Sequence, residues 1–171
     1  MTSIPTLTTE RLLLRPFRDG DLDAYAAIVA DPEVTRFLGD GKPLGRVDAW
    51  RQMAFFVGHW ELRGFGIWAV EERATGVLMG RIGLFEPEGW PGFELGYTLG
   101  RNFWGRGYAS EGARAALAYA REVLGRERVI SLIRAENAGS VRVAEGLGAV
   151  LQGELEFFGA PALVYAYPPT G

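Results

Sequence analysis

The sequence predicts an α+β fold in which about four helices flank a mixed, mostly antiparallel central sheet of about seven strands. Three observations support this class. Apolar residues recur with helical spacing in some segments and follow strand-like patterns in others. Consecutive strand-like segments in the middle of the chain are joined by short turns, so they should pair antiparallel. The length of 171 residues suits one domain, which we expect over 1–171.

The chain opens with a strand and two helices. Residues 10–16 form an apolar segment that ends at a proline, which has no amide hydrogen to give to a sheet. Asp19 and Asp21 can cap a following helix, in which apolar residues recur at helical spacing up to Val29. Pro32 ends this helix or begins another one through Val34 and Phe37. After a glycine-rich loop, the same spacing predicts a second helix over 48–62.

The middle of the chain predicts three neighbouring strands. Residues 66–71 and 77–85 are strand-like and flank the turn 73–76, so they form a hairpin. A turn rich in proline and glycine over 86–92 separates this hairpin from a third strand over 93–99.

The last part of the chain predicts two helices and three strands. An alanine-rich stripe over 109–124 predicts a helix whose small side chains allow close packing on a sheet. Residues 129–133 form a dense β-branched strand, and 138–147 form a helix that Gly148 ends. Two closing strands complete the order, over 149–157 and 162–167.

The composition is that of an ordinary globular protein, with 48% hydrophobic, 12% aromatic and 23% charged residues. The chain has no cysteine, which excludes disulfides and thiolate chemistry, and its single histidine makes a metal cluster unexpected. A net charge of −3 gives no general attraction to nucleic acid, and no apolar run approaches a membrane span. No targeting segment is visible, so we expect a protein of the reducing cytoplasm. The sequence does not decide the oligomeric state, and a homodimer is one of the open alternatives.

Charge is unevenly distributed along the chain. Between Arg101 and Arg142 there are eight arginines and four glutamates, so this segment carries +4 and the remainder −7. A basic segment in an acidic chain indicates a local anion site. Solvated helix faces would give the same pattern, so charge alone leaves both interpretations open.

The most informative segment is 101–111, in which a predicted strand leads into a glycine-rich loop that opens a helix. Such a loop presents consecutive backbone amides that can bind a phosphate, and Arg106 adds positive charge. A simple helix-capping turn is the other interpretation of Gly105 and Gly107. The P-loop sequence is absent, and a dinucleotide fingerprint needs glycine where Ser110 stands, so a dinucleotide-binding oxidoreductase is kept only as an alternative hypothesis.

The whole pattern resembles the GNAT (GCN5-related) N-acetyltransferase superfamily, and within it the branch of the ribosomal-protein alanine N-acetyltransferases. The resemblance runs from residue 7 to the last predicted strand. The superfamily signature Gln/Arg-x-x-Gly-x-Gly/Ala falls on 104–109, where Trp104 departs from the usual first residue as it does in that branch. Residues 110–112 and 137–149 resemble the branch as well.

This resemblance implies the GNAT fold, with a sheet that is splayed between its fourth and fifth strands, 93–99 and 129–133. It implies acetyl-CoA as co-substrate, whose pantetheine arm pairs with backbone groups that the splay leaves free. The implied cofactor-binding residues are Tyr97, Thr98 and Leu99 on the splayed strand, Asn137 beside it, and Gly105, Arg106, Gly107, Tyr108, Ala109 and Ser110 around the pyrophosphate.

The implied activity is transfer of an acetyl group to a primary amine, of a protein N-terminus or a small molecule, by direct attack in a ternary complex. Glu94 is the candidate base, acting through a water, or else a solvated strand carboxylate. Asn137 can hold the pantetheine amide or a water, and Ser140 can protonate the departing thiolate, or both residues only cap a helix. The tyrosine acid of many superfamily members falls on Ala144 here.

Other questions stay open at this point. A non-catalytic acyl-CoA-binding regulatory module would share the loop without needing Glu94 or Ser140. The acidic remainder of the chain leans toward basic acceptors. His59 lies in an aromatic helix, where packing explains it better than catalysis. Five aromatic residues are candidates for an acceptor pocket or for the core: Phe55, Phe56, Trp60, Trp68 and Trp90.

Overall fold

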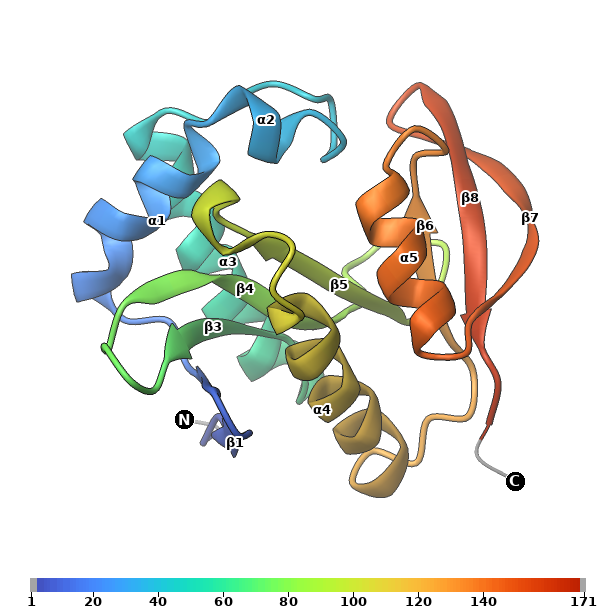
Figure 1. The fold of residues 1–171 in the computed structure, drawn as a ribbon, viewed down its shortest axis with the longest axis horizontal. Helices are drawn as coiled ribbons and strands as arrows, with labels where there is room; N and C mark the ends of the chain where they lie inside the picture. Colours follow the sequence, from blue (N-terminus) through green and yellow to red (C-terminus); the bar gives the residue numbers. More distant parts are fainter. Residues whose placement is uncertain (1–2, 170–171) are drawn as a thin grey trace.

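The structure, a computed structural model that describes residues 3–169, centres on one sheet of eight strands within those residues (Figure 1). The strands lie in the order β1-β2-β3-β4-β5-β6-β8-β7, and every neighbouring pair is antiparallel except β5 and β6. Their bounds are β1 Leu7–Thr8, β2 Leu12–Arg15, β3 Ile67–Glu72, β4 Leu78–Phe85, β5 Glu94–Leu99, β6 Val129–Ile133, β7 Val150–Phe157 and β8 Ala160–Tyr167. The expected α+β class with a mostly antiparallel sheet is therefore confirmed.

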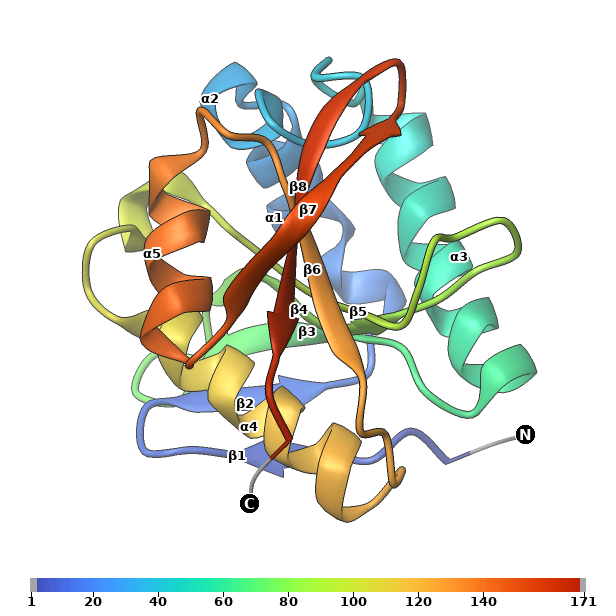
Figure 2. The same cartoon turned by 90° about the vertical axis from the view of Figure 1, so that its right-hand side faces the viewer.

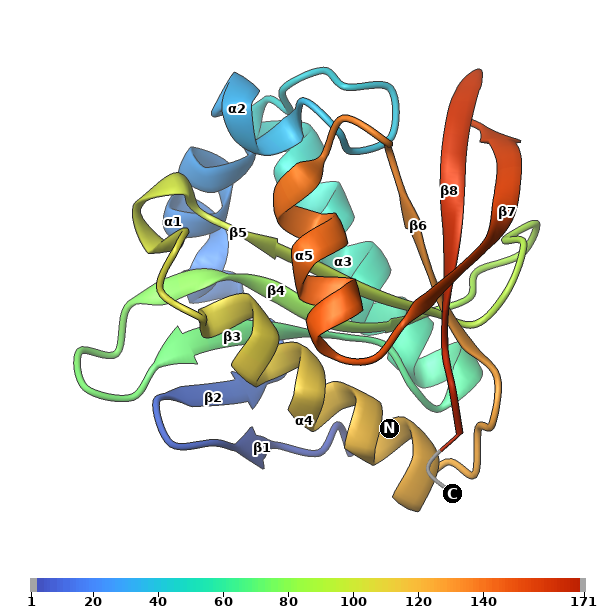
Figure 3. The ribbon, with the colours of Figure 1, turned by 45° about the vertical axis from the view of Figure 1, so that its right-hand side comes forward.

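Five α-helices within the same residues cover both faces of the sheet. Their bounds are α1 Leu22–Val29, α2 Pro32–Thr35, α3 Arg46–Arg63, α4 Tyr108–Glu122 and α5 Ala138–Gly146. Figure 2 shows α3 and α5 on opposite sides of the sheet, and Figure 3 shows α4 crossing the face that β2, β4 and β5 form. None of these helices has the length and apolar character that crossing a membrane requires.

Two short elements add to the seven strands and four helices that the sequence predicts, and α2 is the helix that the sequence allows as an alternative at Pro32. β1 is a two-residue strand that pairs Leu7 with Leu14, too short to produce an alternating pattern. α2 is a single turn that begins at Pro32, where the Asp31 side chain accepts the amide hydrogen of Glu33. The other predicted elements are present, with their ends shifted by no more than two residues.

Strand alternation divides the apolar side chains between two layers, one on each face of the sheet. On α4, the alanines at 113, 116 and 120 are fully buried against one face. Contact there is so close that a Cβ added at Gly112 would come within 2.4 Å of Ile82. The layer under α1 and α3 is formed by Phe17, Tyr25, Val29, Ala49, Met53, Phe56, Ile67, Ala69 and Leu78.

The sheet opens between β5 and β6. These parallel strands pair at one register position, Glu94 opposite Ile130, where the Ile130 amide donates to the Phe93 carbonyl at 3.0 Å. No further backbone pair between the two strands occurs within residues 3–169, and Figure 1 shows the strands running apart. This is the splay that the resemblance implied between the fourth and fifth predicted strands.

Candidate active site

The loop between β5 and α4 presents free backbone amides. Gly105 and Gly107 adopt left-handed conformations, with φ of 74° and 79°, and Gly107 is the N-cap of α4. Within residues 3–169 the amides of 105–110 donate no hydrogen bond, whereas the next amide, of Glu111, bonds to the Gly107 carbonyl at 3.1 Å. Consecutive free amides at the start of a 15-residue helix form an anion cradle, which fits the pyrophosphate of a coenzyme A carrier.

Contacts from Arg11, in the turn between β1 and β2, hold this loop in place. The Arg11 Nε donates to a Glu111 carboxylate oxygen at 2.7 Å, and its Nη1 donates to the Arg106 carbonyl at 2.9 Å. The Arg11 guanidinium also lies 4.2 Å from the centre of the Tyr108 ring. Burial alone would raise the pKa of Glu111, but hydrogen bonds from Thr9 and Arg11 hold this pKa below its usual value. Sequence reasoning missed the contact between Arg11 and Glu111. The only sign of it was that both residues fall in segments that resemble the family.

Trp104, the residue that departs from the superfamily signature, joins the loop to the end of β5. Its indole nitrogen donates to the Leu99 carbonyl at 2.9 Å, so that carbonyl already has a partner. Arg106 is exposed, and its side chain is not among those that line the cavity beside the loop.

Two cavities meet at the open edge of β5. The loop cavity, of about 600 Å³, lies between the loop and the start of α5 and is lined by Gly107 and Ser110 among others. The Glu94 cavity, of about 340 Å³, lies toward α3 and is lined by Glu94 and Phe55 among others. The two cavities share six lining residues: Phe37, Leu38, Tyr97, Thr98, Asn137 and Ser140. One cavity therefore reaches the amide cradle and the other reaches a carboxyl group, with a common border between them.

Glu94 is half-buried at the start of β5. Its carboxylate accepts the Leu132 amide hydrogen at 2.8 Å and the Trp90 indole hydrogen at 3.1 Å. Burial raises the pKa of Glu94 to about 7, against the opposing effect of these hydrogen bonds and of the charge of Arg81. A carboxyl group with a pKa near neutrality can take up and release a proton easily, which suits a general base better than a solvated strand carboxylate does.

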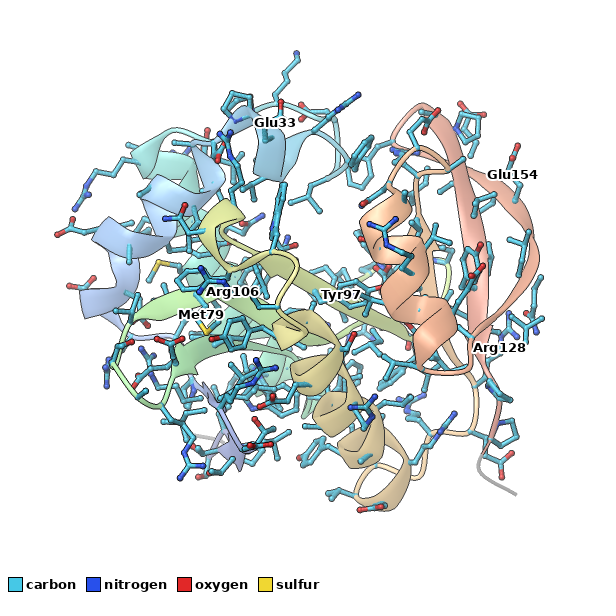
Figure 4. All side chains as sticks on the ribbon, in the orientation of Figure 1. Glu33, Met79, Tyr97, Arg106, Arg128 and Glu154 are labelled. Carbon is cyan, nitrogen blue, oxygen red and sulfur yellow. The ribbon has the colours of Figure 1, made fainter. Side chains whose placement is uncertain are left out.

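The Tyr97 hydroxyl spans the opening between β5 and α5, where it donates to the Ser140 carbonyl at 2.7 Å (Figure 4). Burial raises the pKa of Tyr97, so this hydroxyl stays protonated. Asn137 caps α5 by accepting the Ser140 amide hydrogen at 3.3 Å, while both residues also line the two cavities. The Ser140 hydroxyl has no hydrogen bond within the described chain. Ala144, where many superfamily members have a tyrosine, is fully buried. Sequence reasoning had considered only the backbone of Tyr97.

His59 is packed in the interior, as expected. Its Nδ1 lies 2.8 Å from the Phe65 carbonyl oxygen, and its Nε2 accepts the Glu86 amide hydrogen at 3.1 Å. Burial lowers the pKa of His59, which favours the neutral ring. Of the aromatic candidates, three line the Glu94 cavity and two are buried in the core: Phe55, Phe56 and Trp90 in the first group, Trp60 and Trp68 in the second.

A sheet that opens beside an amide cradle is the arrangement of the GNAT class of acetyltransferases, which use acetyl-CoA. Residues 11–150 match the family model described as an acetyltransferase (GNAT) domain. The chain therefore belongs to the GNAT acetyltransferase family.

Two proteins from Bacillus species are similar to most of the chain. YkkB of Bacillus subtilis is 30% identical over 173 residues, which cover 96% of each chain. The uncharacterized N-acetyltransferase p20 of Bacillus licheniformis is 31% identical over 153 residues, which cover 88% of this chain and 85% of that protein.

Solved structures share the fold. An acetyltransferase from Agrobacterium tumefaciens has a TM-score of 0.86 at 35% identity, covering 96% of this chain and 95% of the other. The ribosomal L7/L12 acetyltransferase RimL in complex with coenzyme A has a TM-score of 0.79 at 18% identity, covering 96% and 98%. This second likeness concerns the fold alone.

Proposed function

We propose that the protein transfers the acetyl group of acetyl-CoA to a primary amine, by direct attack of the amine in a ternary complex. The meeting of the two cavities carries this proposal. The loop cavity reaches the amide cradle, and the Glu94 cavity holds a carboxyl group with a pKa of about 7. A carrier in the first and an amine in the second would meet at Tyr97 and Thr98.

The chain offers a partner for each part of the carrier. The free amides of 105–110 hold the pyrophosphate, with the exposed Arg106 adding positive charge. The open edge of β5 at Tyr97 and Thr98 pairs with the pantetheine amides, and Asn137 borders the same space. When bound, acetyl-CoA supplies the acetyl group as a thioester with an electrophilic carbonyl carbon.

Glu94 performs the first proton transfer of the proposed mechanism. The attacking amine is neutral, because only a neutral amine is nucleophilic. As its nitrogen bonds to the carbonyl carbon it loses one proton, which ionised Glu94 takes up through a water. The nitrogen–carbon bond forms, the carbon–sulfur bond breaks, and the sulfur leaves as a thiol after it takes up one proton. A backbone amide on the open edge of β5 stabilises the developing oxyanion. The Ser140 hydroxyl, which borders both cavities, donates to the thiolate where Ala144 leaves no tyrosine to do so.

Release of free thiol from acetyl-CoA, measured across a panel of small amines and N-terminal peptides, tests the proposal. We expect turnover with at least one class of primary amine. Tight binding of coenzyme A without turnover of any amine would contradict the proposal and identify an acyl-CoA-binding regulatory module instead.

Gly107→Glu tests the cradle in the same experiment. It places a carboxylate beside the free amides, at a position with φ of 79°, and should weaken acetyl-CoA binding in calorimetry. We expect a loss of at least about tenfold, because like charges repel and the backbone is strained. Gly125→Glu is the matched control, since Gly125 has φ of 66° and open space around it beyond the other end of α4. Undiminished affinity in Gly107→Glu would place the carrier elsewhere.

A further inference from the structure

A half-buried arginine lines the Glu94 cavity without a carboxylate partner. Arg81 lies on β4, and its Nε donates to the Tyr25 hydroxyl at 3.1 Å. Its guanidinium carbon lies 5.1 Å from the centre of the Phe56 ring. Within residues 3–169 Arg81 forms no ion pair, and its two terminal nitrogens donate no hydrogen bond. Those two nitrogens form a fork that matches a carboxylate.

Tyr25 gives this arginine a fixed support. Tyr25 is fully buried and donates its hydroxyl hydrogen to the Gln52 side-chain oxygen while accepting from Arg81. Because its Nε is held and its plane packs near Phe56, Arg81 loses little freedom when a ligand binds.

The other charged groups of the Glu94 cavity do not compete with Arg81. Asp40 and Lys42 are exposed on the loop that borders the cavity. Arg134 donates to four backbone carbonyls through its two terminal nitrogens, so these nitrogens are not free to bind a carboxylate. These local charges favour an acidic group on the acceptor, in contrast to the basic acceptor that the overall charge of the chain suggested.

Arg81 and Glu94 stand on the same face of the sheet with open space between them. Arg81 lies opposite Thr98 in the β4–β5 register. Thr98, Gly96 and Glu94 are two residues apart along β5, so they lie on the same face of the strand. Gly96 lines the cavity, and a Cβ added there would meet nothing within 4 Å. Aromatic side chains form the surrounding walls: Phe55, Phe56, Phe85, Trp90 and Phe157.

We propose that the acceptor is a free amino acid with an apolar or aromatic side chain, whose carboxylate binds the terminal nitrogens of Arg81. This inference rests on the proposed function, because it names the acceptor of that reaction. The carboxylate meets the guanidinium, the side chain contacts the aromatic walls, and the amine faces Glu94 and the border of the loop cavity. A volume of about 340 Å³ suits a molecule of this size.

Three acceptors with the same phenyl group test the role of the carboxylate. Phenylalanine carries it, phenylalaninamide replaces it with a neutral group, and 2-phenylethylamine lacks it. We expect kcat/KM for phenylalanine to exceed that for either of the others by about 10- to 100-fold, as a charge-assisted pair would give. Equal values, or a preference for phenylalaninamide, would overturn the proposal.

Variants of Arg81 assign the preference to this side chain. In Arg81→Gln the ratio of kcat/KM between phenylalanine and phenylalaninamide should fall to near parity, and in Arg81→Lys, which lacks the fork, it should be intermediate. Differences in amine basicity cancel, because all enzymes are tested with the same acceptors. Arg51→Gln, on the exposed side of α3, is the matched control and should keep the full ratio. A ratio that survives in Arg81→Gln, or is lost in Lys42→Gln, would overturn the assignment.

Binding to the wild-type protein gives a test that needs neither variants nor turnover. Calorimetry should show that 3-phenylpropanoate, a carboxylate without an amine, binds at least about tenfold more tightly than 3-phenylpropanamide. If no amine is acetylated but this selectivity is seen, the proposed function fails and the carboxylate site stands. If amines are acetylated but the two compounds bind equally, the carboxylate site fails and the proposed function stands.

Discussion

At the scale of single residues, Glu94 sets the pH range in which the site can accept a proton. Burial raises its pKa to about 7, so the carboxyl group is protonated below that pH and ionised above it. Only the ionised form is a base. The ratio of kcat/KM between wild type and Glu94→Gln should therefore rise about tenfold per pH unit up to pH 7 and then stay constant, at about 10²–10⁴. Ionisation of the amine affects both enzymes alike and cancels in the ratio.

Glu88→Gln is the control for this pH profile, because Glu88 lies in the turn before β5 and its side chain is 99% exposed. It should leave kcat/KM unchanged at every pH. A wild-type to Glu94→Gln ratio that does not vary between pH 5 and pH 9 would show that ionisation of Glu94 plays no part in the reaction.

The sequence supports Glu94 as a candidate, but it does not reveal the environment that raises the pKa of this residue. The contacts to Trp90 and Leu132 come from a turn and from β6, and they exist only once the chain is folded. Arg81 was not singled out at all, because a lone arginine in a strand is typical of a solvated position. Only its packing against Tyr25 and the cavity shows otherwise.

At the scale of elements, the turn between β1 and β2 holds the loop between β5 and α4 in place. Arg11 joins this turn to Glu111 on α4 and to the Arg106 carbonyl. In Arg11→Ala both bonds are lost, and the free amides should be less well ordered for binding. We expect KM for acetyl-CoA to rise about three- to tenfold with kcat unchanged, measured by steady-state kinetics at saturating amine.

Arg114→Ala is the matched control, since Arg114 is an exposed arginine on the same helix. It should leave KM unchanged. Arg11→Lys should recover part of the affinity, because an ammonium group can pair with Glu111 but has no fork for a second partner. If Arg11→Ala lowered kcat and left KM as it is, a positioning role would be excluded.

Most elements could be predicted because their apolar residues recur with a spacing that is typical of a helix or of a strand. The alanine stripe predicted that α4 is a helix, and the β-branched residues predicted that β6 is a strand. The bounds of both elements were predicted to within two residues. β1 was missed, and the helix that begins at Pro32 was only one of two alternatives, since two residues or one turn are too few to show a period. The bond from Trp104 to Leu99 could not be predicted either, because it depends on how the loop turns back on β5.

At the scale of the whole molecule, the sheet consists of two parts, β1 to β5 and β6 to β8, that touch along a short joint. Within the described part of the chain, the joint contains one backbone pair at Glu94, the hydroxyl of Ser131 bonded to the Leu95 carbonyl at 2.6 Å, and the bond from Tyr97 to Ser140. A loop and a helix separate these strands in the chain, so spacing could show neither their pairing nor their divergence. The resemblance supplied both.

Ser131→Ala should destabilise this joint by about 1–3 kcal/mol, because the buried Leu95 carbonyl loses the hydroxyl that donates to it. The Tyr167 hydroxyl loses its contact with Ser131 and keeps the one with Tyr97. Urea denaturation measures the change. Ser3→Ala makes the same substitution at an exposed residue and should stay within about 0.5 kcal/mol of wild type. Hydrogen exchange should accelerate more in β6 than in β3, since the damage is local to the joint. Equal stability of the two variants would mean that other contacts hold the two parts of the sheet together.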